Sequence, residues 1–156
     1  MMTNLICNVL DALAGKTLVT AESCTGGGIG AAITAVPGSS AVYKGGVICY
    51  TNWVKENVLG VDPAILKEYG AVSEPAAIAM AEGARKLLKA DVSVSVTGLA
   101  GPGGDEFGNP VGMVYIGYAD NHRTLCKACY FSGDRQQIRE QATQTVLQII
   151  MDNREV

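Results

Sequence analysis

The sequence predicts a single α/β domain with three layers, α/β/α, around a mixed β-sheet. Helical and strand-like segments alternate through the first two thirds of the chain, and two β-rich runs follow before a final helix. Alternation places helices on both faces of a mostly parallel sheet, whereas a hairpin adds antiparallel strands. With 156 residues, 48% of them hydrophobic, the chain suits one domain over residues 1–156.

The first half of the chain carries the alternating elements. Apolar residues recur at helical spacing over residues 4–14, and a short strand is expected over 17–21. A helix of small residues over 27–36 precedes a strand over 46–51. Short helices are then expected from Asn52 and from Asp62, because both residue types cap helices and Pro63 suits a first helical position.

The second half begins with a longer helix over 73–89, which Ser73 and Pro75 open. Strict alternation over 91–97 predicts a strand, and a glycine-rich loop follows over 98–110. The runs 111–118 and 124–131 form the expected hairpin. A last helix is expected over 135–151.

Charge and composition exclude several partners. The formal charge is −3 without any basic run, which argues against nucleic acid, and no segment is apolar enough to span a membrane. Five cysteines without a secretory signal indicate reduced thiols and a cytoplasmic protein. Cys126 and Cys129 have the spacing of a metal pair, but no second pair completes a site, so we expect no metal.

The turn over residues 20–28 is the most informative segment. It lies between a strand and a helix of small residues, so Ser23, Cys24 and Thr25 fall near a helix N-terminus. Such a turn can bind an anion or hold an activated nucleophile. Gly26 and Gly27 allow the close backbone approach that either role needs.

A nucleophile in this turn requires a base. The single histidine, His122, falls in the expected hairpin turn, which disfavours a Ser-His-Asp triad. Ser23 would then rely on a lysine of lowered pKa, and Lys44 and Lys55 both flank the strand over 46–51. Cys24 is a competing nucleophile, or a buried packing residue.

Other polar residues leave two interpretations open. Glu22 either orients a base or substrate, or interacts with the helix N-terminus. Arg135 and Arg139, one turn apart at the start of the last helix, either bind an anionic ligand or form a solvated face. The glycine-rich segment over 97–104 also follows a strand, so the two loops frame a crevice where α/β sheets bind ligands.

Six short strings occur in an order that resembles one known family. They are Ala21-Glu22-Ser23-Cys24-Thr25-Gly26-Gly27, Pro37-Gly38-Ser39-Ser40, Gly70-Ala71-Val72-Ser73-Glu74-Pro75, Thr97-Gly98-Leu99-Ala100-Gly101-Pro102-Gly103-Gly104, Pro110-Val111-Gly112 and Phe131-Ser132-Gly133-Asp134-Arg135. Together they resemble the CinA C-terminal domain family, the nicotinamide mononucleotide (NMN) deamidases, over residues 5–150. The chain is similar to the stand-alone form, which lacks the additional N-terminal domain.

The resemblance implies a cytoplasmic, commonly dimeric amidohydrolase that needs no cofactor and converts NMN and water to nicotinic acid mononucleotide and ammonia. The implied catalytic residues are Ser23 as nucleophile, Lys55 as base, and Tyr50, which relays the proton or orients the base. The loop over 105–109 departs from the usual family sequence. The implied ligand contacts are Cys24, Thr25, Gly26, Gly27, Ser40, Thr97, Gly98 and Arg135.

Two alternatives stay open at this point. The domain could bind a nucleotide in a regulatory role without turnover, as a competence- or damage-inducible CinA-like module. It could also hydrolyse the amide of another pyridine or ribonucleotide. Ammonia release from NMN, compared with a panel of amides, separates the three hypotheses.

Overall fold

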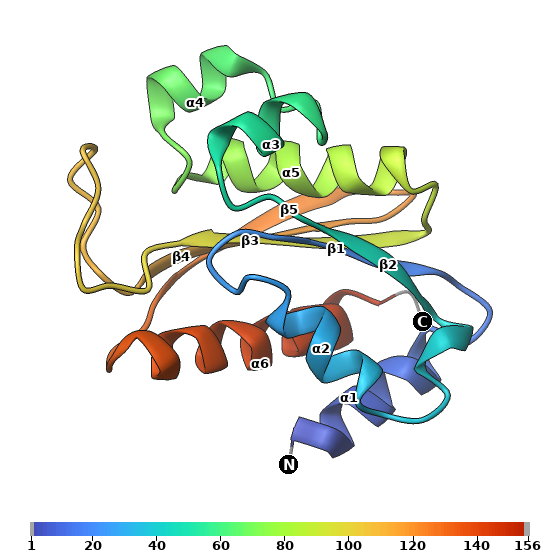
Figure 1. Cartoon of the computed structure of the whole chain (residues 1–156). Helices are drawn as coiled ribbons and strands as arrows, with labels where there is room; N and C mark the ends of the chain where they lie inside the picture. The colour runs from blue at the N-terminus through green and yellow to red at the C-terminus, as the bar shows by residue number, and fades with distance from the viewer. Residues whose placement is uncertain (1, 155–156) are drawn as a thin grey trace.

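The computed structural model describes residues 2–154, which form one five-stranded sheet between two helical layers (Figure 1). The strand order is β2-β1-β3-β4-β5. The strands β1 and β2, and β1 and β3, pair in parallel, whereas β4 is antiparallel to both β3 and β5. The predicted mixed sheet is therefore confirmed. The strands are β1 (Leu18–Glu22), β2 (Tyr43–Ile48), β3 (Val92–Gly98), β4 (Met113–Ala119) and β5 (Thr124–Tyr130).

The helices cover both faces of the sheet, so the three-layer prediction also holds (Figure 1). One layer contains α1 (Met2–Ala12), α2 (Gly28–Thr34) and α6 (Arg135–Asn153). The other contains α3 (Asn52–Asn57), α4 (Pro63–Tyr69) and α5 (Glu74–Leu87). A short 3-10 turn, η1 (Ser39–Ala41), precedes β2. Within the described residues, no helix combines the length and hydropathy that a bilayer span requires.

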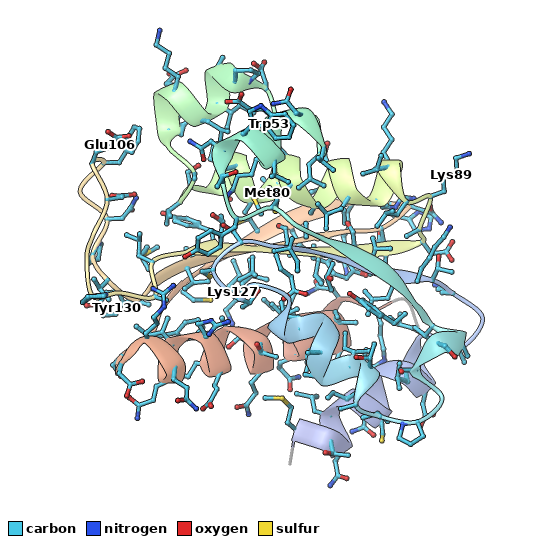
Figure 2. The ribbon with its side chains drawn as sticks, in the orientation of Figure 1. Trp53, Met80, Lys89, Glu106, Lys127 and Tyr130 are labelled. Atoms are coloured by element: carbon cyan, nitrogen blue, oxygen red, sulfur yellow. The ribbon has the colours of Figure 1, made fainter. Side chains whose placement is uncertain are left out.

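Apolar side chains form a separate core on each side of the sheet. Ile6 and Val9 of α1 pack with Ile138 of α6 on one side. On the other side, Met80 of α5 points toward the sheet (Figure 2) and packs with Val19 of β1. The cores fix the sheet between the two helical layers, and the loops at the strand ends remain available for a site.

Side-chain caps begin three of the helices, whereas the expected cap at Asn52 is wrong: Asn52 is the first residue of α3, and the N-cap Thr51 makes no side-chain cap hydrogen bond. The Asp62 carboxylate accepts a hydrogen bond from the Ala64 N–H at 2.9 Å, and Ser73 accepts one from the Ala76 N–H at 3.3 Å. Asp134 and Gln137 form a reciprocal capping box at the start of α6. That box fixes where α6 begins, and so positions Arg135 and Arg139.

The second strand differs from its prediction. It spans Tyr43–Ile48, three residues earlier than the predicted range 46–51. Gly46 lies against β1 where a side chain would not fit, because a Cβ there would lie 2.3 Å from the Thr20 hydroxyl oxygen. The Cys49 N–H still donates to the Glu22 carbonyl at 2.9 Å, and the chain then leaves the sheet toward α3. This early exit brings the Cys49 and Tyr50 carbonyls to Lys55.

Candidate active site

A cleft of about 550 Å³ lies beyond the C-terminal ends of the parallel strands β1 and β3. This is the edge where open α/β sheets usually bind ligands, and the volume falls within the range of small-molecule sites. The cleft is bounded by the turn after β1, the start of α3, the α4–α5 connection, the glycine-rich loop and the start of α6. Its lining includes Ser23, Cys24, Tyr50, Lys55, Thr97, Gly98, Gly101 and Arg135.

Ser23 and Lys55 meet at the base of this cleft. The Lys55 Nζ lies 3.0 Å from the Ser23 Oγ, although the two residues are 32 positions apart in the chain. The Ser23 residue is 7% exposed and Lys55 only 1%. A hydroxyl and an amine at this distance satisfy the geometric requirement for a nucleophile and its base.

Lys55 is held by backbone carbonyls rather than by a carboxylate. Its Nζ donates to the Cys49 carbonyl at 2.7 Å and to the Tyr50 carbonyl at 3.4 Å. Burial lowers the pKa of Lys55 from its ordinary value of 10.5. In the neutral amine, two N–H groups serve the two carbonyls, and the lone pair is left to accept the Ser23 proton.

The other candidate base lies elsewhere. The exposed Lys44 amine donates to the Lys89 carbonyl at 3.3 Å, near the end of the sheet opposite the cleft. Of the two lysines that flank β2, the structure thus brings only Lys55 to Ser23.

Glu22 satisfies the N-terminus of α2, which removes the anion-binding interpretation of that helix end. Its carboxylate accepts hydrogen bonds from the Ile29 N–H at 2.8 Å and the Gly30 N–H at 3.0 Å. It also accepts from the Thr25 hydroxyl at 2.8 Å and the Thr20 hydroxyl at 3.1 Å. The side chain is 2% exposed. The carboxylate therefore fixes the strand, turn and helix that carry Ser23.

Cys24 has the environment of a packing residue rather than a thiolate. Burial raises the pKa of its thiol to about 11. Of the two interpretations of Cys24, the structure favours the packing residue, because α2 begins only at Gly28 and Glu22 accepts from the N–H groups of Ile29 and Gly30. At neutral pH the Cys24 thiol stays protonated and is a poor nucleophile.

The remaining residues of the turn serve its shape. Gly26 and Gly27 have φ angles of 58° and 98°, in the left-handed region that favours glycine. The Thr25 hydroxyl is committed to Glu22, and the Thr25 carbonyl accepts a hydrogen bond from Arg139. These three residues do not line the main cleft. We therefore assign them to the support of Ser23 rather than to ligand contact.

Tyr50 and Arg135 form one side of the cleft mouth. The Arg135 guanidinium donates to the Gly101 carbonyl at 2.6 Å and to the Tyr50 hydroxyl at 3.1 Å. The Tyr50 side chain is 57% exposed, and its hydroxyl faces Arg135 rather than Lys55. Tyr50 thus contacts Lys55 through its backbone carbonyl, not through the hydroxyl that a proton relay needs.

Thr97 and Gly98 form the end of β3 at the floor of the cleft. The Thr97 hydroxyl donates to the Ala71 carbonyl at 2.7 Å, which ties β3 to the α4–α5 connection. With its proton committed there, the Thr97 oxygen is left as an acceptor. Gly98 lies against Val114 of β4, where a Cβ would be 2.6 Å from a methyl carbon.

Ser40 is not brought to the cleft. It lies exposed in η1, before β2, whereas the cleft is at the far end of the parallel strands. The first paired residues, Leu18 and Tyr43, mark the end of the sheet near Ser40. We do not carry Ser40 into the proposed site.

The divergent loop over 105–109 is ordered by its own side chains. The Asp105 carboxylate accepts from the N–H groups of Phe107 and Asn109, and the Asn109 amide donates to the Val72 carbonyl at 3.1 Å. Phe107 packs on Gly70 of the α4–α5 connection. Glu106 lies at the loop tip, away from the sheet (Figure 2). The loop closes one side of the cleft, a role that its sequence alone did not reveal.

The cleft lining does not include His122, Cys126 or Cys129. The His122 N–H donates to Asp120 in the exposed turn between β4 and β5, as predicted for a turn histidine. Cys126 and Cys129 are free thiols on β5. Within residues 2–154, no group of three or more His, Cys, Asp or Glu side chains is placed to hold a metal ion.

With this geometry established, comparison with known proteins is decisive. The profile of the CinA C-terminal domain matches residues 2–153. The chain belongs to the CinA C-terminal domain family. The CinA fold is also seen in a solved CinA superfamily protein from Klebsiella pneumoniae, with a TM-score of 0.95, 33% identity, and coverage of 97% of this chain and 96% of that one.

Two further relatives are consistent with membership of the CinA family. A solved competence/damage inducible protein from Agrobacterium tumefaciens is 37% identical, with a TM-score of 0.93 and coverage of 97% of this chain and 94% of that one. A "CinA-like protein" from Synechococcus is 58% identical over 106 residues, which is 68% of this chain. The matched part spans a quarter of that relative's length, 25%. These names describe the CinA family and state no reaction.

Proposed function

We propose that this CinA domain is an amidohydrolase that converts NMN and water to nicotinic acid mononucleotide and ammonia. The observation that carries the proposal is the buried contact of 3.0 Å between the Ser23 Oγ and the Lys55 Nζ in the cleft. The Lys55 amine contacts Ser23 and two backbone carbonyls, and the single histidine, His122, lies in the exposed turn between β4 and β5. A Ser–Lys pair of this kind performs acyl transfer, since a lysine of lowered pKa can accept the serine proton.

In the first half of the reaction, the Ser23 hydroxyl transfers its proton to Lys55 as Oγ attacks the carboxamide carbon. The carbonyl oxygen becomes an oxyanion, and we assign its stabilisation to the backbone N–H of Cys24, the first amide after the nucleophile. Lys55 then returns the proton to the departing nitrogen, and ammonia leaves. The acyl group remains as an ester on Ser23.

In the second half, water attacks this ester. Lys55 accepts a proton from the water and delivers it to the Ser23 Oγ as the ester bond breaks. The two carbonyls that bind Lys55 keep its lone pair directed at Ser23 in both halves. The acid product and the free enzyme result, so protons and bonds balance over the cycle.

Arg135 supports the choice of a phosphorylated substrate. Its guanidinium lies at the cleft mouth beside the glycine-rich loop and, within residues 2–154, donates two of its five N–H groups to protein acceptors. The exposed Tyr50 ring beside it offers a flat apolar face for a pyridine ring. We place the phosphate at Arg135 and the loop, and the carboxamide at Ser23, with Thr97 and Gly98 as the floor between them.

The setting of the reaction follows from the same resemblance. The five free cysteines support a cytoplasmic location, where thiols stay reduced. We also propose that the protein is a homodimer, as the resemblance implies. Light scattering of the purified protein measures its oligomeric state.

A substrate panel tests the proposal. Ammonia release is measured with NMN, with its dephosphorylated riboside and with free nicotinamide. We expect turnover of NMN and much lower kcat/KM for the two compounds without phosphate. Saturable NMN binding by calorimetry without ammonia release would instead favour the regulatory nucleotide-binding role. Equal turnover of all three amides would contradict the phosphate site at Arg135.

A further inference from the structure

Arg139 of α6 reaches across to the turn that follows Ser23. Its Nε donates to the Cys24 carbonyl at 3.1 Å, and its Nη2 donates to the Thr25 carbonyl at 3.0 Å. Residues 114 and 115 positions apart in the chain are thus joined by two hydrogen bonds. Both acceptors are uncharged backbone carbonyls, so both are charge-assisted hydrogen bonds from the guanidinium.

Two series of hydrogen bonds and peptide units connect Arg139 to the turn, and the first ends at the Cys24 N–H, beside the nucleophile. The carbonyl and N–H of a trans peptide unit point in opposite directions, so a bond at one end fixes the other. The Thr25 carbonyl accepts from Arg139 and also from the Gly28 N–H at 2.9 Å, and it belongs to the same peptide unit as the Gly26 N–H. That N–H donates to the Ser23 carbonyl at 3.1 Å. The Ser23 carbonyl in turn shares its peptide unit with the Cys24 N–H.

The second series is shorter. The Cys24 carbonyl, bound by the Arg139 Nε, shares its peptide unit with the Thr25 N–H. The N–H groups of Cys24 and Thr25 donate to no backbone carbonyl among the described residues. Their peptide units are therefore held and polarised from the carbonyl side, while no backbone carbonyl occupies the N–H side. Consecutive hydrogen bonds strengthen one another by about 10–30% each.

The field of Arg139 reaches the atoms next to Ser23. Burial raises the pKa of the Cys24 thiol, and the Arg139 charge opposes that rise. Cys24 also lines the cleft next to Ser23. An N–H that is held at this point by a cation-bonded network suits an oxygen that gains negative charge.

We infer that Arg139 is a positioning residue for the oxyanion site of Ser23, which it orients and polarises through the peptide units of residues 23–26. This inference rests on the proposed acyl transfer at Ser23, but not on NMN as the substrate. Arg139 does not touch the substrate; it sets the direction and strength of the Cys24 amide, whose residue lines the cleft beside Ser23. Arg135, one helical turn earlier, has the separate role of ligand contact.

The expected effect is a loss of kcat without a loss of binding. Removal of one oxyanion donor outright costs about 100- to 1000-fold in kcat. Arg139→Gln leaves the donor in place but frees and depolarises it, so we expect kcat to fall by about 10- to 100-fold, with KM changed less than about 3-fold. Arg139→Lys keeps the charge but supplies a single-point donor, and should lose about 3- to 10-fold.

A fluorophosphonate probe tests the inference independently of the substrate. The Ser23 Oγ attacks phosphorus, fluoride leaves, and Lys55 takes the serine proton; the phosphoryl oxygen of the adduct occupies the oxyanion position. The rate of labelling is measured for wild type, Arg139→Gln and Arg139→Lys, with Ser23→Ala as the blank. Arg123→Gln is the matched control, because Arg123 donates to the Asn153 carbonyl at 2.8 Å, away from the cleft.

The inference predicts labelling in the order wild type, Arg139→Lys, Arg139→Gln, with Arg123→Gln at the wild-type rate. A folded Arg139→Gln protein that is labelled as fast as wild type overturns it, and so does a wild type that is not labelled at Ser23. If Arg139→Gln fails to fold, wild-type labelling of Arg139→Lys overturns it instead. Slower labelling of the Arg139 variants without any NMN turnover by wild type supports the role of Arg139 and rejects the proposed substrate.

Discussion

The carboxylate of Glu22 is the structural support of the nucleophile turn, and Glu22→Gln tests it with a calculable cost. One oxygen accepts from the Ile29 N–H and the Thr25 hydroxyl, and the other accepts from the Gly30 N–H and the Thr20 hydroxyl. A glutamine amide replaces one of these oxygens by a donor. Whichever way it is oriented, one backbone N–H of α2 then faces an NH₂ group and loses its acceptor.

The magnitude follows from two contributions. A buried donor left without its partner costs about 1–3 kcal/mol. Loss of the negative charge at the N-terminus of α2 adds about 0.3–1 kcal/mol. The free energy of unfolding should therefore fall by about 1.5–4 kcal/mol. For a domain of this size that corresponds to a decrease in Tm of about 3–16 °C, at roughly 2–4 °C per kcal/mol.

Urea unfolding followed by circular dichroism gives the difference in free energy directly. The matched control is Asp62→Asn, which makes the same chemical change at the exposed cap of α4. Because aspartate and asparagine cap helices about equally well, that variant should lose less than about 0.5 kcal/mol. A loss for Glu22→Gln that is no larger than the loss for Asp62→Asn would refute the argument.

Three further predictions concern the cleft. Because only the neutral amine accepts the Ser23 proton, the rate of ammonia release should rise with pH and reach half of its plateau below pH 10.5, the ordinary value from which burial lowers the pKa of Lys55. Between the lowered pKa of Lys55 in the folded protein and 10.5, the unfolded chain binds more protons at Lys55 than the folded chain does. The free energy of unfolding of wild type, measured by urea titration, should therefore rise with pH relative to that of Lys55→Met. A difference between the two proteins that does not change with pH would contradict the burial of a titrating amine. Cys24→Ala should keep turnover within about 3-fold, because a thiol of pKa about 11 is not ionised at neutral pH; a large loss would restore Cys24 as the nucleophile. Arg135→Ala should raise KM for NMN by about 10- to 100-fold, the effect of losing one charged hydrogen bond, while kcat/KM for the riboside changes little; equal losses on both substrates would place Arg135 in the chemistry instead.

The sequence was sufficient for the architecture because local signals agreed with one another. Alternation over 91–97 and the caps at Asp62 and Ser73 have direct structural counterparts in β3, α4 and α5. The range predicted for β2 was three residues too late because Tyr43 and Lys44 precede two glycines, which lower strand propensity. The sequence around Cys49 and Tyr50, in contrast, favours a strand. Pairing with β1 decided the boundary, and pairing is not a local property.

For the site, residue types were easier to predict than their partners. Both Lys44 and Lys55 were possible bases, and only the fold shows that Lys55 is buried against Ser23. The hydrogen bond from the Thr97 hydroxyl to the Ala71 carbonyl gives no signal in the sequence. The same holds for Arg139, whose carbonyl acceptors lie more than a hundred residues earlier in the chain. Backbone acceptors carry no side-chain identity, so such contacts leave no motif.

The central claim is that the Ser23–Lys55 pair hydrolyses the carboxamide of NMN, and ammonia release by wild type and Ser23→Ala tests it most directly. Wild type should release one ammonia for each nicotinic acid mononucleotide formed. Ser23→Ala, with its Tm within a few degrees of wild type, should lose at least about 1000-fold in kcat, since no nucleophile remains. Near-normal turnover by Ser23→Ala would contradict the account.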